Sequence, residues 1–277
     1  MKPRHVASCL LATLWWLAAM PAPLRAQTAP PTGSQPSPAK PAATAPLEIV
    51  FVGNSLTHFH DLPAMVQALG HAATPPRQIR TTMLAPGGFT LEQHWAATGA
   101  AAPRTVLKQQ KPDFVVLQEQ SRRPIDDPKR MLEFAGKFAT LAKQRRAEPV
   151  WYQTWARSNE PQHQDGIAVA YEQAQQKFGG RLAPVGRAFQ LALQQTKEPS
   201  LHSPDGIHPT PAGSYLAALV LYATMTGADV TTSPDRLVVA GADGKERVLV
   251  ELAPEAGAHL RRLAAKCVAD QRPPARR

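Results

Sequence analysis

The sequence predicts an α/β sandwich, in which helices cover both faces of a mostly parallel sheet. From Leu47 to Gly227, short runs of Val, Ile, Phe and Leu alternate with longer segments whose apolar residues recur every three or four positions. Strands that alternate with helices in this way form βαβ units, which favour parallel pairing. The stretch 47–270 has the length of one domain with a full hydrophobic core.

Five strands and six helices are expected between Leu47 and Gly227. The strands lie near 48–53, 78–84, 113–118, 149–154 and 182–185. The helices cover 61–72, 90–97, 127–146, 164–178, 186–195 and 211–226. This alternation predicts a flavodoxin-like three-layer α/β/α sandwich with a five-stranded sheet. Ligands of such sheets bind at the carboxyl ends of the strands, where the strand order reverses.

Two of these helices carry signals at their ends. Asp61 is a candidate cap for the 61–72 helix, because a short carboxylate can accept a hydrogen bond from the first backbone N–H groups. Thr210 is the equivalent candidate for the 211–226 helix, and Gly227 follows the last turn of that helix. The 211–226 helix should therefore begin directly after Thr210.

Beyond Asp229 the pattern changes to an extension of two short strands and a helix, which we expect to cover 231–270. The apolar runs 237–239 and 248–250 flank a glycine-containing turn, which predicts a β-hairpin. A helical segment follows, with an apolar stripe that should pack on the main body. The stripe consists of Leu260, Leu263 and Cys267.

The N-terminal residues predict an export signal and a linker. Residues 1–26 combine early basic residues, an apolar stretch and small residues, which is typical of a secretory signal peptide cleaved after Ala26. The apolar stretch is too short to span a bilayer. Residues 27–46 hold six prolines among small and polar residues, which predicts a disordered linker. We therefore expect a periplasmic or secreted protein without a membrane span after cleavage, ending in a basic tail at 271–277.

Charge and cysteine content exclude two classes of protein. The formal net charge is +10 at pH 7, but no stripe of basic and aromatic residues accompanies it. A solvated basic surface explains the charge, and no nucleic-acid partner is expected. Cleavage after Ala26 would remove Cys9 and leave Cys267 alone. The mature chain would then have no internal disulfide.

Ser55, His208 and Asp205 are the candidate catalytic residues. Ser55 follows the first strand through a Gly53-Asn54 turn, and so can project from the sheet edge. Asp205 and His208 lie three residues apart, just before a helix. Ester hydrolysis through serine needs a nucleophile, a base that takes its proton and an acid that orients the base. These three residues can supply the three roles.

Negative charge that develops on a carbonyl oxygen needs hydrogen-bond donors. The candidate oxyanion donors are the backbone N–H groups of Ser55 and Gly88 and the side-chain amide of Gln120. Gly88 follows the second strand and lacks a Cβ, so its N–H can approach a ligand closely. Further residues near strand ends are expected to bind substrate. These are Gly87, Gln118, His58 and Trp155, with His94 and Trp95 as additional candidates for the groove wall.

His58, His60 and Asp61 are residue types that ligate transition metals. Alternate residues of a loop point in different directions, and no third histidine has a matching spacing. We therefore expect no metal, and place His58 or His60 at the rim of the substrate crevice.

Taken in order, these motifs resemble the four sequence blocks of SGNH/GDSL-type serine esterases over roughly 47–227. The resemblance implies that Ser55 is the nucleophile, His208 the base and Asp205 the orienting acid. It also implies oxyanion donation by the backbone amides of Ser55 and Gly88. The matching segments are Gly53-Asn54-Ser55-Leu56, the Gly88 loop, Gln118-Glu119-Gln120 and Asp205-x-x-His208.

Two positions depart from the family pattern. The usual Gly-Asp-Ser is Gly-Asn-Ser here, which preserves the turn because Asn and Asp both bond their own backbone. The third block is usually Gly-x-Asn-Asp, whereas Gln118 replaces the glycine and Gln120 takes the place of the asparagine. Gln120 carries the same amide on a longer stem. The pattern resembles a bacterial branch distinct from typical lipase and thioesterase members.

The expected activity is cofactor-free hydrolysis of a small acyl ester, such as an acetate, on a carbohydrate or other polar substrate. The reaction would pass through an acyl–Ser55 intermediate. Two alternatives remain open at this point. A degenerate hydrolase fold could serve as a glycan-binding protein, or the same triad could transfer the acyl group to a sugar hydroxyl as an O-acyltransferase.

Overall fold

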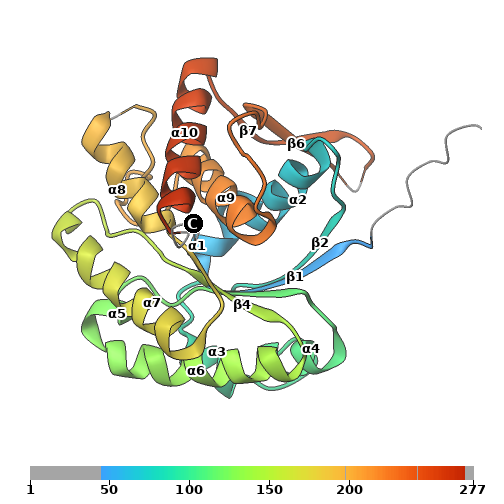
Figure 1. The fold of residues 1–277 in the computed structure, drawn as a ribbon, viewed down its shortest axis with the longest axis vertical. Coiled ribbons are helices and arrows are strands. Elements are labelled where there is room, and N and C mark those ends of the chain that lie inside the picture. Colours follow the sequence, from blue (N-terminus) through green and yellow to red (C-terminus); the bar gives the residue numbers. More distant parts are fainter. Residues whose placement is uncertain (1–44, 197, 242, 272–277) are drawn as a thin grey trace, which may run out of the picture. The chain divides into compact units, whose positions relative to one another are not determined.

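The computed structural model describes residues 45–196, 198–241 and 243–271 (Figure 1). The predicted signal peptide 1–26, the linker up to residue 44 and the basic tail from residue 272 lie outside the described residues. Within the described ranges, no helix combines the length and the apolar character that a membrane span requires.

A five-stranded parallel sheet with strand order β2-β1-β3-β4-β5 forms the centre of the fold. This is the flavodoxin-like order, so the predicted fold class is confirmed. The pairing aligns Val52 with Leu84 on one side and with Leu117 on the other. The carboxyl ends of β2, β1 and β3 therefore meet at one edge of the sheet. The strands are β1 (Leu47–Val52), β2 (Ile79–Leu84), β3 (Phe114–Leu117), β4 (Glu148–Tyr152) and β5 (Arg181–Ala183).

Helices cover both faces of this sheet (Figure 1). All six predicted helices are present, and each end agrees within two residues. They are α2 (Leu62–Ala72), α3 (Leu91–Ala96), α6 (Pro128–Gln144), α7 (Gln164–Phe178), α8 (Val185–Gln195) and α9 (Pro211–Thr226). The sequence analysis missed elements of one or two turns, because these are too short to show a period. They are α1 (Ser55–His58), η1 (Phe59–Asp61), α4 (Pro103–Gln109), α5 (Arg123–Asp126) and η2 (Pro161–His163).

The sheet separates two apolar cores. Alternate residues of a strand point to opposite faces, so Ile49 and Phe51 enter one core while Val50 and Val52 enter the other. Helices α2, α8 and α9 pack on the first face, and α3, α6 and α7 pack on the second (Figure 1). Because both faces are covered, the strands read as continuous apolar runs rather than as alternating ones.

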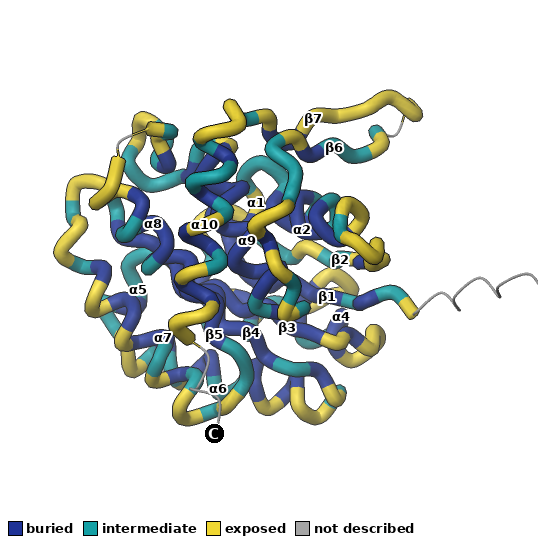
Figure 2. Tube along the Cα trace, turned by 45° about the horizontal axis from the view of Figure 1, so that its top comes forward, coloured by how far each residue is buried: buried dark blue, intermediate teal, exposed yellow. Residues whose placement is uncertain are grey.

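The C-terminal extension has the predicted form. Strands β6 (Arg236–Ala240) and β7 (Glu246–Glu251) form an antiparallel hairpin, and α10 (Pro254–Asp270) follows it. The predicted stripe of Leu260, Leu263 and Cys267 is buried in the core shared with α9. Burial raises the pKa of the Cys267 thiol to about 11, so this thiol stays protonated and unreactive. Figure 2 shows the hairpin at the rim of the fold, where most of β7 is exposed, while Leu249 and Val250 are buried.

One of the two predicted helix caps is confirmed. Thr210 Oγ1 accepts a hydrogen bond from Gly213 N at 3.2 Å, and Gly227 follows α9 with φ 73°. The prediction for Asp61 is wrong. It occupies the cap position of α2, but its backbone is left-handed and its side chain makes no capping bond. Its carboxylate pairs instead with Arg247 of β7, which sequence spacing does not reveal.

Helix α9 is buried along nearly its whole length, because α2, α8 and α10 surround it. Leu219 at its centre is 0% exposed. Leu219→Ala should therefore lower the free energy of unfolding by about 2–5 kcal/mol, measured by urea denaturation. Leu193→Ala on α8 is the control, since Leu193 is 43% exposed. Equal losses for both variants would contradict the central position of α9.

Candidate active site

Ser55, His208 and Asp205 form a continuous chain of hydrogen bonds. The distance from Ser55 Oγ to His208 Nε2 is 2.9 Å, and that from His208 Nδ1 to Asp205 Oδ2 is 2.6 Å. A carboxylate accepts, so Nδ1 carries the proton that it donates to Asp205. Nε2 is then the acceptor for the Ser55 hydroxyl. This order of partners is the one that activates a serine toward a carbonyl carbon.

The Gly53-Asn54 turn places Ser55 at the end of β1 and at the start of α1. Asn54 Oδ1 accepts from Leu56 N at 3.1 Å, as the turn chemistry of Asn predicts. Asn54 Nδ2 also donates to Phe89 O at 2.9 Å, which ties the turn to the loop after β2. An aspartate could make the first bond but not the second. The asparagine therefore links two segments of the site.

Asp205 is fixed by three hydrogen bonds. It accepts from the ring of His208, and its Oδ1 accepts from Ile207 N at 2.9 Å and from His208 N at 3.0 Å. The His208 ring first, and then the two backbone N–H groups, lower the pKa of Asp205 to about 2. Asp205 is thus an anion at neutral pH. It can orient the imidazole and stabilise a positive charge on it.

Comparison with known proteins identifies the family. No family model and no curated protein matches the chain. A protein from Slackia heliotrinireducens described as an SGNH hydrolase is 32% identical, and the match covers 65% of this chain and 100% of that one, with a TM-score of 0.55. The chain belongs to the SGNH hydrolases.

Two further solved structures share the fold of this SGNH hydrolase at lower identity. A DUF4886 family protein from Bacteroides uniformis is 17% identical, with coverage of 81% of this chain and 95% of that chain and a TM-score of 0.58. Axe2, an acetylxylan esterase from Geobacillus stearothermophilus, is also 17% identical, with coverage of 66% and 94% and a TM-score of 0.51. At this identity the likeness concerns the fold alone.

Gln118 does not bind substrate in this SGNH hydrolase, contrary to the prediction. It is fully buried beneath the Ser55 turn. Its Oε1 accepts from Asn54 N at 2.8 Å and from Thr57 Oγ1 at 2.9 Å, and its Nε2 donates to the Glu119 carbonyl. A Cβ at Gly53 would come within 2.6 Å of the same Oε1. Gln118 therefore supports the turn that carries Ser55.

The prediction that Trp155 lines the substrate groove is also wrong. Trp155 is 2% exposed, and its ring stacks on Phe189 with 4.2 Å between centroids. Its Nε1 donates to Ile207 O at 3.0 Å, inside the segment that carries Asp205 and His208. An aromatic residue after a strand is as often a core residue as a binding residue. Here it anchors the acid–base segment.

The predicted oxyanion donors lie around the Ser55 turn. The N–H groups of Ser55 and Gly88 donate to no residue in the part of the chain that the structure describes. Gly88 has φ 72°, which favours glycine, and both Gly87 and Gly88 are exposed. The side-chain oxygen of Gln120 already has partners, since Oε1 accepts from Arg122 N at 2.8 Å and from Arg123 N at 3.2 Å. Only its Nε2 is left to donate to a ligand.

His58 and His60, predicted at the rim, have different surroundings. His58 is exposed, while His60 Nδ1 lies 2.9 Å from Ser214 Oγ on α9. Across the described ranges, no group of three or more His, Cys, Asp or Glu side chains is arranged to hold a metal ion.

Three residues of the site were missed or misplaced by the sequence analysis. His94 is buried, and its Nε2 donates to Gly53 O at 2.6 Å, so it braces the Ser55 turn from below instead of lining the groove. Desolvation lowers its pKa, which keeps the ring neutral. Phe59 stacks on the His208 ring, with centroids 4.2 Å apart and planes at 12°. No periodic signal marks either contact.

Glu119 is the third of these residues. It is almost fully buried, and its Oε1 accepts from Gln120 N at 2.7 Å and from Leu91 N at 3.1 Å. The carboxyl group thus joins the end of β3 to the start of α3, next to the two loops that carry Gln120 and Gly88. Burial raises the pKa of Glu119 to about 7, although the two backbone bonds act in the opposite direction.

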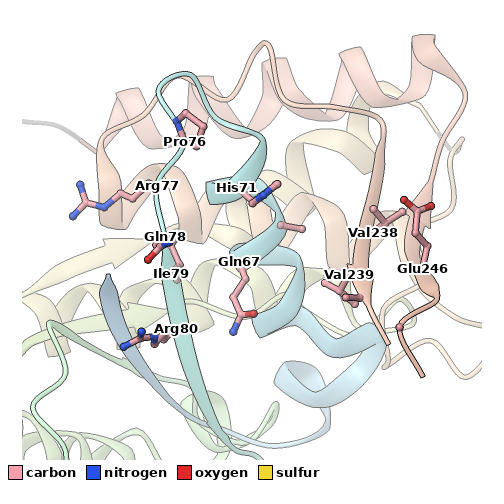
Figure 3. Close-up of a pocket in the computed structure, with 13 residues that line it drawn as sticks. Gln67, His71, Pro76, Arg77, Gln78, Ile79, Arg80, Val238, Val239 and Glu246 are labelled. Carbon is pink, nitrogen blue, oxygen red and sulfur yellow. The ribbon is translucent and has the colours of Figure 1, made fainter. Parts of the chain in front are cut away.

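A cavity of about 780 Å³ lies between α2, the start of β2 and the C-terminal hairpin (Figure 3). Gln67 and His71 of α2, the start of β2 and residues of the hairpin line it. The amino end of β2 is opposite to the sheet edge that carries Ser55. Volume alone therefore does not locate the active site of this SGNH hydrolase.

The raised pKa of Glu119 predicts a pH dependence of stability. Between its ordinary value of 4.5 and about 7, the folded protein keeps a proton that the unfolded chain has released. Stability should therefore fall as pH rises through this window, by on the order of 3 kcal/mol at most. Glu119→Gln should remove this fall, measured by urea denaturation at pH 5 and pH 8.

The exposed Glu255 provides the matched control. Glu255→Gln should keep the wild-type pH dependence. An unchanged slope in Glu119→Gln would show that Glu119 is ionised in the fold throughout this range.

Proposed function

We propose that this SGNH hydrolase is a serine esterase that removes a small acyl group of acetyl type from a carbohydrate or other polar substrate. The observation that carries the proposal is the chain from Ser55 Oγ through the His208 ring to the Asp205 carboxylate. Each group lies within hydrogen-bond distance of the next one, in the order that acyl transfer needs. The proposed reaction uses no cofactor.

The proposed mechanism has two stages. In the first, His208 Nε2 takes the Ser55 proton as Oγ attacks the ester carbonyl carbon. The tetrahedral intermediate then expels the alcohol, which receives that proton from His208 and leaves an acyl–Ser55 ester. In the second stage, His208 takes a proton from water as the water attacks the acyl group. Collapse returns the proton to Ser55 and releases the acid.

Negative charge on the carbonyl oxygen would be stabilised by the N–H groups of Ser55 and Gly88, with Gln120 Nε2 as a third donor. The support is that both backbone donors are unused within the described chain. The Gln120 amide is oriented by its bonds to the backbone of Arg122 and Arg123. Glu119 holds the two loops that carry these donors, and so acts as a positioning residue.

The reason for the alternative, a catalytically degenerate glycan-binding protein, no longer applies. It arose because Gln118 replaces a family glycine, but Gln118 binds the backbone of the nucleophile turn and supports it. A carbohydrate ester is favoured as substrate by the acetylxylan esterase among the structures that share the fold. Hydrolysis and acyl transfer to a sugar use the same triad and differ only in the acceptor.

We also propose that the protein is exported to the periplasm or secreted. The support is the signal-peptide pattern of residues 1–26, with cleavage after Ala26. A small-molecule or glycan ester is then the expected partner in the cell envelope or outside the cell.

Ser55→Ala and His208→Ala should each reduce kcat for p-nitrophenyl acetate by at least about 10³-fold, because each removes an indispensable member of the proton-transfer chain. Circular dichroism and thermal melts would check that the fold is intact. His71→Ala, at an exposed histidine on α2, should retain the wild-type rate. Retained activity in either triad variant would overturn the assignment.

A further inference from the structure

We propose that the cavity walled by Phe59, whose ring stacks on His208, is the subsite for the alcohol half of the ester. In this proposal it takes an uncharged sugar residue, and Arg247 of the C-terminal hairpin sets this preference. The cavity has a volume of about 530 Å³ and is lined by His58, Phe59, His60, Asp61, Met83 and Arg247. This inference rests on the proposed function and adds the identity of the leaving group.

The position of the cavity identifies which half of the substrate it holds. Phe59 lies in its wall and is stacked face to face on the His208 ring. In acyl transfer the leaving alcohol takes its proton from the imidazole, so the alcohol must lie on the imidazole side. The carbonyl oxygen faces the other way, toward the N–H groups of Ser55 and Gly88. The cavity shares Phe59 with the imidazole side of the site, and this contact assigns it to the leaving-group side.

The lining combines apolar and polar surfaces. Phe59 and Met83 provide apolar surface, and Met83 is 36% exposed. His58 and the Asp61–Arg247 ion pair provide donors and acceptors. A sugar ring has the matching composition, because its C–H face is apolar and its hydroxyl groups both donate and accept. The volume of about 530 Å³ has room for such a ring.

The ion pair argues against other leaving groups. Asp61 already balances the charge of Arg247, so the cavity offers no unpaired cation to a carboxylate or phosphate. A long alkyl alcohol would shield the partly exposed pair from water without providing hydrogen bonds, which is unfavourable. Hydroxyl groups can bond to both members of the pair without separating them. The cavity therefore suits an uncharged polyol.

The hairpin helps to form the wall of the cavity. His60 and Asp61 both have left-handed backbone, with φ 54° and 55°, which is a costly conformation for residues other than glycine. Ser214 of α9 holds His60, and Arg247 of β7 holds Asp61. The hairpin lies beyond residue 227, outside the segment that carries the family motifs. The subsite thus combines residues next to the Ser55 motif with a residue of the C-terminal hairpin.

The test compares two esters of acetate, p-nitrophenyl acetate and mono-O-acetylated methyl β-xylopyranoside. The readout is the ratio of kcat/KM for the sugar ester to kcat/KM for the aryl ester. Arg247→Ala should lower this ratio about tenfold, which corresponds to the loss of one or two hydrogen bonds to the sugar. Arg247→Lys should lower it less, since it keeps the charge but loses the planar fork.

Arg236→Ala is the matched control. Arg236 lies on the same hairpin, pairs with Glu246 and Glu251, and is not in the cavity wall. It should leave the ratio at the wild-type value. Met83→Ala changes the same wall without touching the ion pair, and should also lower the ratio. It provides the test if Arg247→Ala does not fold.

An unchanged ratio in folded Arg247→Ala or Met83→Ala would overturn the subsite. So would a wild-type enzyme that cleaves p-nitrophenyl acetate but not the acetylated xyloside. Failure of the wild-type enzyme on both esters, by contrast, would overturn the proposed esterase function itself. The two failures are therefore distinguishable.

Discussion

The hydrogen bond between Ser55 Oγ and His208 Nε2 is the interaction on which the rest of the site depends. The two residues are 153 positions apart in sequence and 2.9 Å apart in space. The parallel sheet makes this possible, because it brings the carboxyl end of β1 to the same edge as the segment before α9. A serine without this contact would be an ordinary hydroxyl group, and Asp205 would orient an imidazole that has no nucleophile to deprotonate.

Buried polar side chains hold this contact in place. Gln118 and His94 bond to the backbone of the turn that carries Ser55, and Trp155 bonds to the backbone of the segment that carries His208. Each polar group that these bonds use is satisfied, and a fully satisfied buried network restricts a site to one geometry. Glu119 extends the network toward the loops with the candidate oxyanion donors. Gln118 thus stands where the family pattern has a glycine, and its side chain supports the turn that carries Ser55.

The sheet, the six predicted helices and the close approach of Ser55, His208 and Asp205 could be predicted because periodicity and local motifs encode them. The roles of Gln118 and Trp155 could not, because a side chain at a strand end faces either the core or the crevice according to neighbours distant in sequence. The same applies to Asp61, whose partner Arg247 lies 186 positions away. Elements of a single turn, such as α1, are too short to produce a period.

The most direct test of the central claim is covalent labelling with a fluorophosphonate, followed by mass spectrometry of the peptides. Only a serine whose proton an adjacent base can accept reacts readily with this probe. The account predicts one adduct per chain, on Ser55, and its loss in His208→Ala. Absence of labelling in the folded wild-type protein, or an adduct on a different serine, would contradict it.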